Sequence, residues 1–196
     1  TFHDAVSCFY LTGHYGKALY VLRRALKDIE KDVWDFETLA ALTEALFKGY
    51  VDRRAAYDLQ EWDVELSEKK FETPLGDGLE DNGRIDLLAD ITRKKDIWIV
   101  EHKTKSWVQS TPESLSFDSQ LCNQITATRN WGFDTQGAIY NIIKVPYAKP
   151  NRNETSADFK ARIYSDIIAR PSFYFIRYFV QPSQDALDAA QRDAKE

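Results

Sequence analysis

The stretch GRIDLLADITRKKDIWIVEHKTKS, from Gly83 to Ser106, decides how this chain folds. It holds two runs, Arg84–Ala89 and Ile97–Glu101, on either side of the charged segment Thr92–Asp96. Short runs rich in apolar residues that flank a polar turn are typical of a β-hairpin. Because Ile97-Trp98-Ile99-Val100 is apolar at every position, we expect a strand buried on both faces inside a sheet.

The same hairpin brings charged side chains together. Folding it about a turn at Lys94 places Asp86 nearly opposite Glu101 and His102. Side chains alternate along a strand, so Glu101 and Lys103 project from one face and His102 from the other. Two carboxylates suit a hard cation such as Mg²⁺ or Mn²⁺. A lysine beside them can orient a water molecule or stabilise negative charge on a phosphate.

A simpler interpretation competes with this one, because Glu-x-Lys is a common pattern on solvated surfaces. The context favours a chemical role. Glu101 and Lys103 follow directly after the buried apolar run. Charges in such a place need partners or a function, since an unpaired buried charge is costly.

Outward from the hairpin, the chain predicts alternating helices and strands. Before it we expect helix over Phe2–Leu26 with a break at Thr12–Gly16, helix over Asp35–Tyr57, extended chain from Trp62, and a turn at Gly76-Asp77-Gly78. After it we expect a helix over Ser114–Trp131, a strand over Gly137–Val145, a loop and helix within Asn151–Arg170, a strand over Ser172–Val180, and an Ala-rich helix after Gln181. This order predicts one mixed α/β domain.

Length and composition set limits on the function. The 196 residues suffice for one domain, and no apolar run approaches the roughly 18 residues of a membrane helix. We expect no signal peptide from the opening residues, which begin at Thr1 and not at Met. A net charge of −5 argues against a protein that coats DNA non-specifically, but a nuclease with clustered carboxylates remains compatible. Cys8 and Cys122 cannot make a disulfide framework, which favours a reducing, intracellular compartment.

The central residues resemble the core of RecB-like PD-(D/E)XK nucleases, whose usual form is G-R-x-D, a hairpin, and then (D/E)-x-K-T. Other segments are similar to further parts of that superfamily: Phe2-His3-Asp4-Ala5 to its histidine helix, Glu68–Leu75 to the strand before the hairpin, and Asp118–Leu121 to its glutamine helix. GAIYNIIKVPYAKP at 137–150, Phe159-x-x-Arg162 and Phe175-Ile176-Arg177 resemble phage-encoded members.

This resemblance implies an α/β fold with a restriction-endonuclease-like core, a central mixed β-sheet flanked by helices. It implies a single nuclease domain over 1–196, with N-terminal helices in 1–60, the catalytic hairpin and core in 61–145, and a C-terminal strand and helices in 146–196. The implied activity is metal-dependent hydrolysis of DNA, as an exonuclease in phage or bacterial recombination, repair or DNA processing. DNA is then the expected partner and the cytoplasm of a bacterium or an infected host the expected location.

The resemblance also implies roles for individual residues. It implies four metal ligands: the side chains of His3, Asp86 and Glu101, and the main-chain carbonyl of His102. Lys103 would be the catalytic lysine, and Gln120 would position the nucleic acid. Gln124 departs from the pattern, since relatives carry tyrosine four residues after the glutamine. The expected cofactor is Mg²⁺ or Mn²⁺, and no iron–sulfur cluster is expected because its four cysteines are missing.

Several further residues carry two interpretations each. Arg84 is expected to pair with a nearby acid, or else to meet a phosphate. Glu68 is either a second-shell acid at the metal or a charge at the strand edge. A phosphate-binding rim is expected from Lys105, Arg129 and Lys144. Base stacking or core packing is expected of Trp98, Trp107 and Trp131, with packing favoured for Trp98. His14 is expected at the surface, and the two cysteines as small buried side chains.

Two other functions stay open at this point. The first is a catalytically idle nuclease fold that binds DNA or a protein partner, although such a protein need not keep Asp86, Glu101 and Lys103 together. The second is another enzyme on a similar hairpin, such as a metal-dependent phosphatase or an RNA-directed nuclease. A comparison of duplex DNA, single-stranded DNA, RNA and a small phosphoester as substrates separates them.

Overall fold

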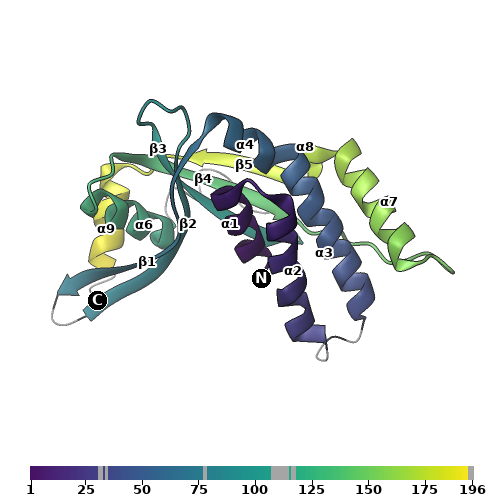
Figure 1. Cartoon of the computed structure of the whole chain (residues 1–196). Coiled ribbons are helices and arrows are strands. Elements are labelled where there is room, and N and C mark those ends of the chain that lie inside the picture. Colours follow the sequence, from purple (N-terminus) through teal and green to yellow (C-terminus); the bar gives the residue numbers. More distant parts are fainter. Residues whose placement is uncertain (31–32, 34, 77–78, 107–114, 116–117, 194–196) are drawn as a thin grey trace. The chain divides into compact units, whose positions relative to one another are not determined.

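A long antiparallel hairpin of β1 (Asp63–Gly76) and β2 (Leu79–Asp90) dominates the sheet in the computed structural model of the chain (Figure 1). The structure describes residues 1–30, 33, 35–76, 79–106, 115 and 118–193. In the register of this hairpin, Ser67 faces Leu87 and Lys69 faces Ile85. β1 matches the extended chain predicted from Trp62 and includes Gly76, which the sequence assigned to the turn, whereas β2 extends beyond the predicted run Arg84–Ala89. Asp77 and Gly78, which the sequence assigns to a turn, lie outside the described residues.

Strand β3 (Ile97–Lys105) forms the predicted second hairpin with β2. The pairing runs antiparallel from Asp90 opposite Ile97 to Leu87 opposite Val100. The first six residues of β3 are buried, as expected for a strand inside a sheet.

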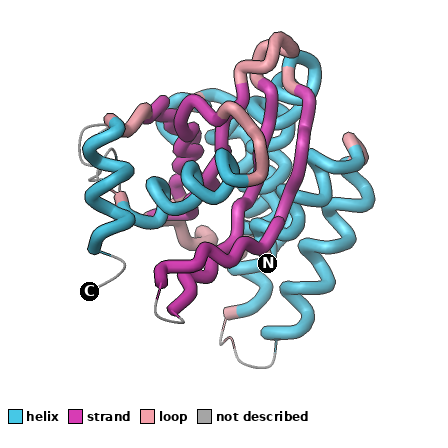
Figure 2. The backbone as a smooth tube through the Cα atoms, turned by 90° about the vertical axis from the view of Figure 1, so that its left-hand side faces the viewer, coloured by secondary structure: helices cyan, strands magenta, loops and turns pink. Residues whose placement is uncertain are grey.

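Two more strands, β4 (Thr135–Lys144) and β5 (Phe175–Val180), complete a sheet in the order β1-β2-β3-β4-β5. Figure 2 shows the strands in magenta. This mixed sheet with flanking helices confirms the predicted α/β class and is compatible with a restriction-endonuclease-like core. The prediction of strand over Ser172–Val180 is wrong at its start. Pro171 begins a short helix, α8 (Pro171–Tyr174), because its fixed φ suits a first helical position.

The chain divides into two compact units, each assembled from separate segments. Unit 1 comprises the described residues of 1–60, 104–107 and 142–176, and unit 2 those of 61–103, 108–141 and 177–196. The helices of unit 1 are α1 (Phe2–Thr12), α2 (Tyr15–Ile29), α3 (Phe36–Tyr50), the π-helical turn η2 (Val51–Ala55), α4 (Ala56–Glu61, whose last residue falls in unit 2), α7 (Ser156–Ala169) and α8.

Within unit 1, α1 packs on α2 and α3 packs on α7. The predicted break between the first two helices is confirmed, because Gly13 ends α1 in the left-handed conformation. Gly49 permits the close approach of α3 and α7, since a Cβ there would lie 2.4 Å from the Ile167 side chain. Exposed His14 precedes α2, as expected for a surface residue.

Unit 2 contains β1, β2 and most of β3, β4 and β5. Two helices, α6 (Ser119–Asn130) and α9 (Gln184–Asp193), pack on each other, and α6 also packs on β1 and β2. The apolar core there includes Phe71, Ile85, Leu88, Ile99, Leu121, Ile125 and Leu187. The predicted helix over Ser114–Trp131 is observed from Ser119, where the Asp118 side chain caps it. Ser114, Ser116 and Phe117 lie outside the described residues.

In the part of the chain that the structure describes, no helix is both long and apolar enough to cross a membrane. Cys122 is buried, as expected for a small apolar side chain, whereas Cys8 is only partly buried. Both thiols are free.

Candidate active site

The candidate site lies in unit 2, where β2 and β3 stop pairing. The ladder ends at Leu87 opposite Val100, so Asp86 and Glu101 come next on the two strands. The Asp86 carboxylate instead accepts a hydrogen bond from the His102 backbone N–H at 3.0 Å. This confirms the prediction that Asp86 lies nearly opposite Glu101 and His102.

Glu101 and Lys103 project from the same face of β3, as strand alternation predicts. Lys103 Nζ lies 2.5 Å from Glu101 Oε1, and the Glu101 side chain is only 5% exposed. Lys103 is 30% exposed. The pair therefore combines a carboxylate held almost out of water with an ammonium that solvent can still reach.

Two glutamines of α6 donate hydrogen bonds to the Glu101 carboxylate. Gln124 Nε2 lies 3.2 Å from Glu101 Oε2 and 3.1 Å from the Arg84 carbonyl oxygen. Gln120 Nε2 lies 3.4 Å from Glu101 Oε1, and Gln120 Oε1 lies 3.5 Å from Lys103 Nζ. Residues four apart share a helix face, so the spacing of Gln120 and Gln124 was the signal in the sequence that both side chains reach the same site. Gln124, which departs from the superfamily pattern, is thus a buried support of the site.

The surroundings of Glu101 disfavour the ionised form of its carboxyl group. Burial raises the pKa of the Glu101 carboxyl, and the nearby charge of Asp86 raises it further. Lys103 and the Gln124 hydrogen bond act in the opposite direction without cancelling the rise in pKa. Two carboxylates that oppose each other's ionisation are a common feature of functional sites.

Glu68 and Arg84 form an ion pair on β1 and β2, with Arg84 Nε 2.7 Å from Glu68 Oε2. This confirms the expected pairing of Arg84 with an acid. Glu68 falls opposite Asp86 in the hairpin register, between the pairs made by Ser67 and Lys69. Its φ of +53° lies in the left-handed region, which is uncommon for residues other than glycine and is concentrated at functional sites.

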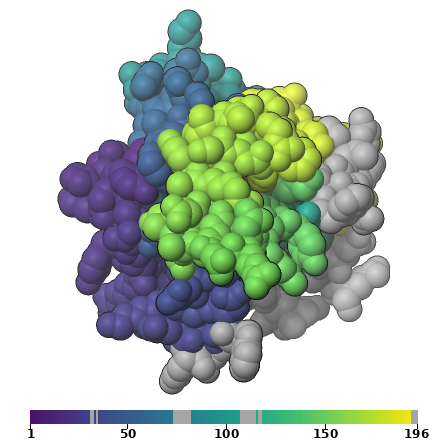
Figure 3. Space-filling model, turned by 90° about the vertical axis from the view of Figure 1, so that its right-hand side faces the viewer, coloured from purple at the N-terminus to yellow at the C-terminus, as the bar shows by residue number. Residues whose placement is uncertain are grey.

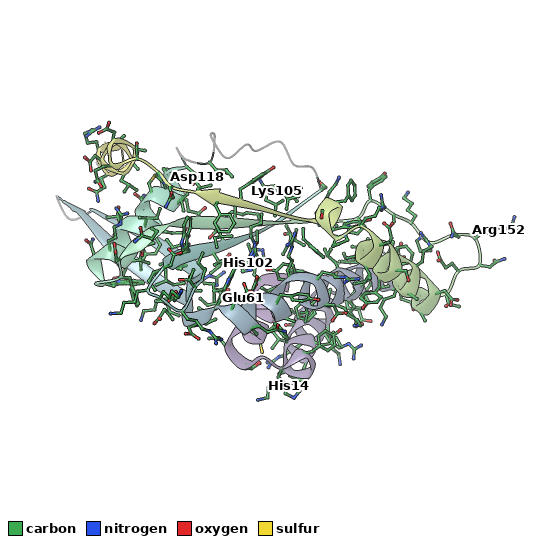
Figure 4. All side chains as sticks on the ribbon, turned by 90° about the horizontal axis from the view of Figure 1, so that it is seen from above. His14, Glu61, His102, Lys105, Asp118 and Arg152 are labelled. Atoms are coloured by element: carbon green, nitrogen blue, oxygen red, sulfur yellow. The ribbon has the colours of Figure 1, made fainter. Side chains whose placement is uncertain are left out.

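The side chain of His102, which is labelled in Figure 4, is buried and belongs to a polar network with Asn141 and Arg177. Its Nε2 lies 3.4 Å from Asn141 Nδ2, and Arg177 Nε donates to Asn141 Oδ1 at 2.7 Å. The Arg177 guanidinium lies 4.9 Å from the centre of the Trp62 ring. Such contacts fit a structural role for the imidazole. Asn141 was not among the residues predicted from the sequence, although one polar residue within the apolar run GAIYNIIKV was a signal for it.

The donor set fits a magnesium-type ion better than a closed metal cage. Among the described residues, no three His, Cys, Asp or Glu side chains gather around one point that could hold a metal. Mg²⁺ in enzymes is usually bound through one or two carboxylates, with water and substrate phosphates completing its shell. Asp86 and Glu101 could supply two such carboxylates, and the His102 carbonyl stays the predicted further ligand.

The other predicted residues are distributed between the two units. His3, in α1, and Lys105 belong to unit 1, so their assignments to this site stay predictions. Arg129 donates to the Thr135 carbonyl at 2.9 and 3.1 Å. Trp98 is buried against Phe179, as expected of a packing residue, and Trp131 is 39% exposed. Trp107 lies outside the described residues.

Comparison with known proteins adds no family assignment. No protein-family model matches the chain, and no curated protein matches it in sequence. The resemblance to PD-(D/E)XK nucleases therefore rests on the motif residues themselves.

Proposed function

We propose that this chain is a Mg²⁺- or Mn²⁺-dependent nuclease that hydrolyses phosphodiester bonds in DNA. The observation that carries the proposal is the grouping of buried Glu101 with Asp86 and Lys103 at the open end of one hairpin. The negative charges of Asp86 and Glu101 repel each other, which favours the binding of a cation between them. The Lys103 ammonium, which solvent can reach, favours an anionic substrate. DNA as substrate, and end-dependent cleavage, rest on the superfamily resemblance.

Each residue has a defined part in the proposed reaction. Asp86 and Glu101 would hold the metal ion, which when bound polarises a phosphate and lowers the pKa of a bound water. Lys103 would hold the attacking water or a non-bridging phosphate oxygen through its ammonium. Gln120 and Gln124 fix the Glu101 carboxylate, so little reorganisation is needed when substrate binds. Catalysis then depends on positioning and on stabilising charge.

The test is cleavage of end-labelled linear DNA and closed circular DNA with Mg²⁺, with Mn²⁺ and with EDTA. We expect metal-dependent loss of the linear substrate, and a rate at least about a hundredfold lower for Lys103→Ala. Lys94→Ala is the matched control, because Lys94 is an exposed lysine in the turn of the same hairpin.

Unchanged cleavage by Lys103→Ala would remove this lysine from the mechanism. Absence of cleavage by the unmodified chain with either metal would instead favour the idle nuclease fold that binds without reacting. RNA and a small phosphoester, run alongside, separate a DNA nuclease from an RNA-directed nuclease or a phosphatase.

A further inference from the structure

A cavity of about 750 Å³ lies entirely within unit 1, outside the candidate active site. It is bounded by the end of β4, the loop that follows it, α7 and α8, and Figure 3 shows these segments in green and yellow-green. Its volume is in the range of small-molecule sites. The lining side chains that matter for binding are Lys144, Tyr147, Arg162, Asp166, Arg170 and Phe173.

The most accessible aromatic ring in this lining belongs to Tyr147, which is 97% exposed. It stands between Pro146 and Pro150 in the loop after β4. The loop is attached at its start, because the Val145 backbone N–H donates to the Lys105 carbonyl at 2.8 Å. A large aromatic side chain held in water on a proline-restricted loop is a platform on which a planar group can stack.

Three cations and one acid line the cavity, in a chain whose net charge is −5. Arg170 pairs with Asp166 at 2.5 Å, and Arg162 pairs with Glu154 at 2.7 Å. Lys144 has no carboxylate partner among the residues described. Its ammonium lies 3.6 Å from the centre of the Phe173 ring, which holds the charge in place without neutralising it.

We propose that this cavity binds one nucleotide unit of a single-stranded nucleic acid. The base stacks on Tyr147, and the adjoining phosphate is bound by the Lys144 ammonium, with Arg170 nearby. An exposed aromatic ring and a cation without a carboxylate partner, which here line one cavity, are the combination that binds single strands with little sequence preference. The inference concerns unit 1 alone and requires neither a metal ion nor cleavage.

The test is fluorescence anisotropy of a labelled oligothymidylate with the full chain in EDTA, where a metal-dependent nuclease is inactive. Tyr147→Ala should raise Kd by at least about fivefold, because base stacking on an aromatic ring contributes that much or more. Tyr147→Phe should bind like the unmodified chain. Tyr20→Ala is the matched control, since Tyr20 is 67% exposed on α2 of the same unit.

An abasic oligomer of equal length separates stacking from charge. Tyr147→Ala should not weaken its binding further, whereas Lys144→Ala should weaken binding of both oligomers. Lys144→Ala should also reduce the slope of log K against log salt by about 0.7, as expected for one lost phosphate contact on a single strand. Lys17→Ala, at an exposed lysine of α2, should leave the slope unchanged.

The proposal fails if the chain does not bind the oligothymidylate, or if Tyr147→Ala and Tyr20→Ala give the same Kd. It also fails if the Tyr147 and Lys144 variants lose affinity for heparin as strongly as for the oligomer, which would indicate a general polyanion surface. A chain that binds but cleaves nothing would uphold this inference and overturn the nuclease proposal. Cleavage with no effect of these variants on binding would do the reverse.

Discussion

Each end of the β2–β3 hairpin holds a buried acid, and the pKa values of these two acids are shifted in opposite directions. At the closed end, the Asp90 carboxylate accepts hydrogen bonds from the backbone N–H groups of Thr92, Lys94, Lys95 and Asp96. Burial raises the pKa of Asp90, but these hydrogen bonds outweigh it and leave the pKa below its ordinary value. At the open end, burial and Asp86 raise the pKa of Glu101.

The difference separates an acid that stabilises the fold from one that, in the proposed function, binds the metal ion. Asp90 organises the hairpin turn, where Arg93 and Lys95 have positive φ, and its charge is satisfied within the protein. The charge of Glu101 is opposed by the nearby Asp86 carboxylate, and the ion pair with Lys103 compensates it only in part. The closed end therefore contributes stability, and the open end keeps a buried charge that costs stability, as expected of the proposed metal site.

The largest effect should come from Glu101→Gln, which keeps the shape of the side chain but removes its charge. We expect cleavage to fall at least about a hundredfold, since the metal loses one of two carboxylates. Because the buried charge is also removed, the free energy of unfolding in EDTA should stay level or rise. Cleavage assays and urea denaturation measure the two effects. Glu65→Gln, at an exposed site on β1, is the control.

A smaller effect is expected for Gln124→Leu, which removes the donor to Glu101 and to the Arg84 carbonyl. Loss of a residue that orients a metal ligand typically lowers metal affinity by about 10- to 100-fold. Titration with Mn²⁺ measures this affinity, and Asn123→Leu on the same helix is the control. Unchanged affinity in Gln124→Leu would mean that Gln124 contributes only to packing.

Asp90→Asn should affect stability without a direct effect on the chemistry. The amide keeps one acceptor oxygen, but an NH₂ group replaces the oxygen that accepts the Lys95 N–H at 2.6 Å. We expect a loss of about 1–2 kcal/mol in the free energy of unfolding. Urea denaturation measures it, with exposed Asp134→Asn as the control. A cleavage defect as large as that of Glu101→Gln would contradict the contrast between the two ends.

The smallest and most specific effect is in the pH dependence of unfolding, measured in EDTA. The lowered pKa of Asp90 adds stability above the ordinary Asp value of about 3.9, and this is lost as the pH falls through the folded-state pKa. The raised pKa of Glu101 adds stability below the ordinary Glu value of about 4.3, lost as the pH rises through the folded-state pKa. Difference profiles for Asp90→Asn and Glu101→Gln should therefore slope in opposite directions, and parallel slopes would contradict this assignment.

Sequence reasoning was most successful where the signal is local. The apolar run Ile97–Val100, the charged turn after Asp90 and the alternation of Glu101 with Lys103 are all short-range features, and the structure confirms each one. It failed at Ser172–Tyr174, where aromatic residues suggested strand but Pro171 starts a helical turn. Here the local backbone preference of proline outweighed the apolar composition.

The sequence by itself determined the α/β class, the hairpin, and the placement of Asp86 beside Glu101 and His102, because strand pairing and side-chain alternation follow from spacing alone. Only the tertiary structure decided that Gln124 supports Glu101, that Asn141 and Arg177 surround His102, and that Lys144 and Tyr147 share a cavity with α7 and α8. These contacts join residues far apart in the chain. Their geometry depends on how helices pack against strands, and no periodic pattern of residues in the sequence indicates it.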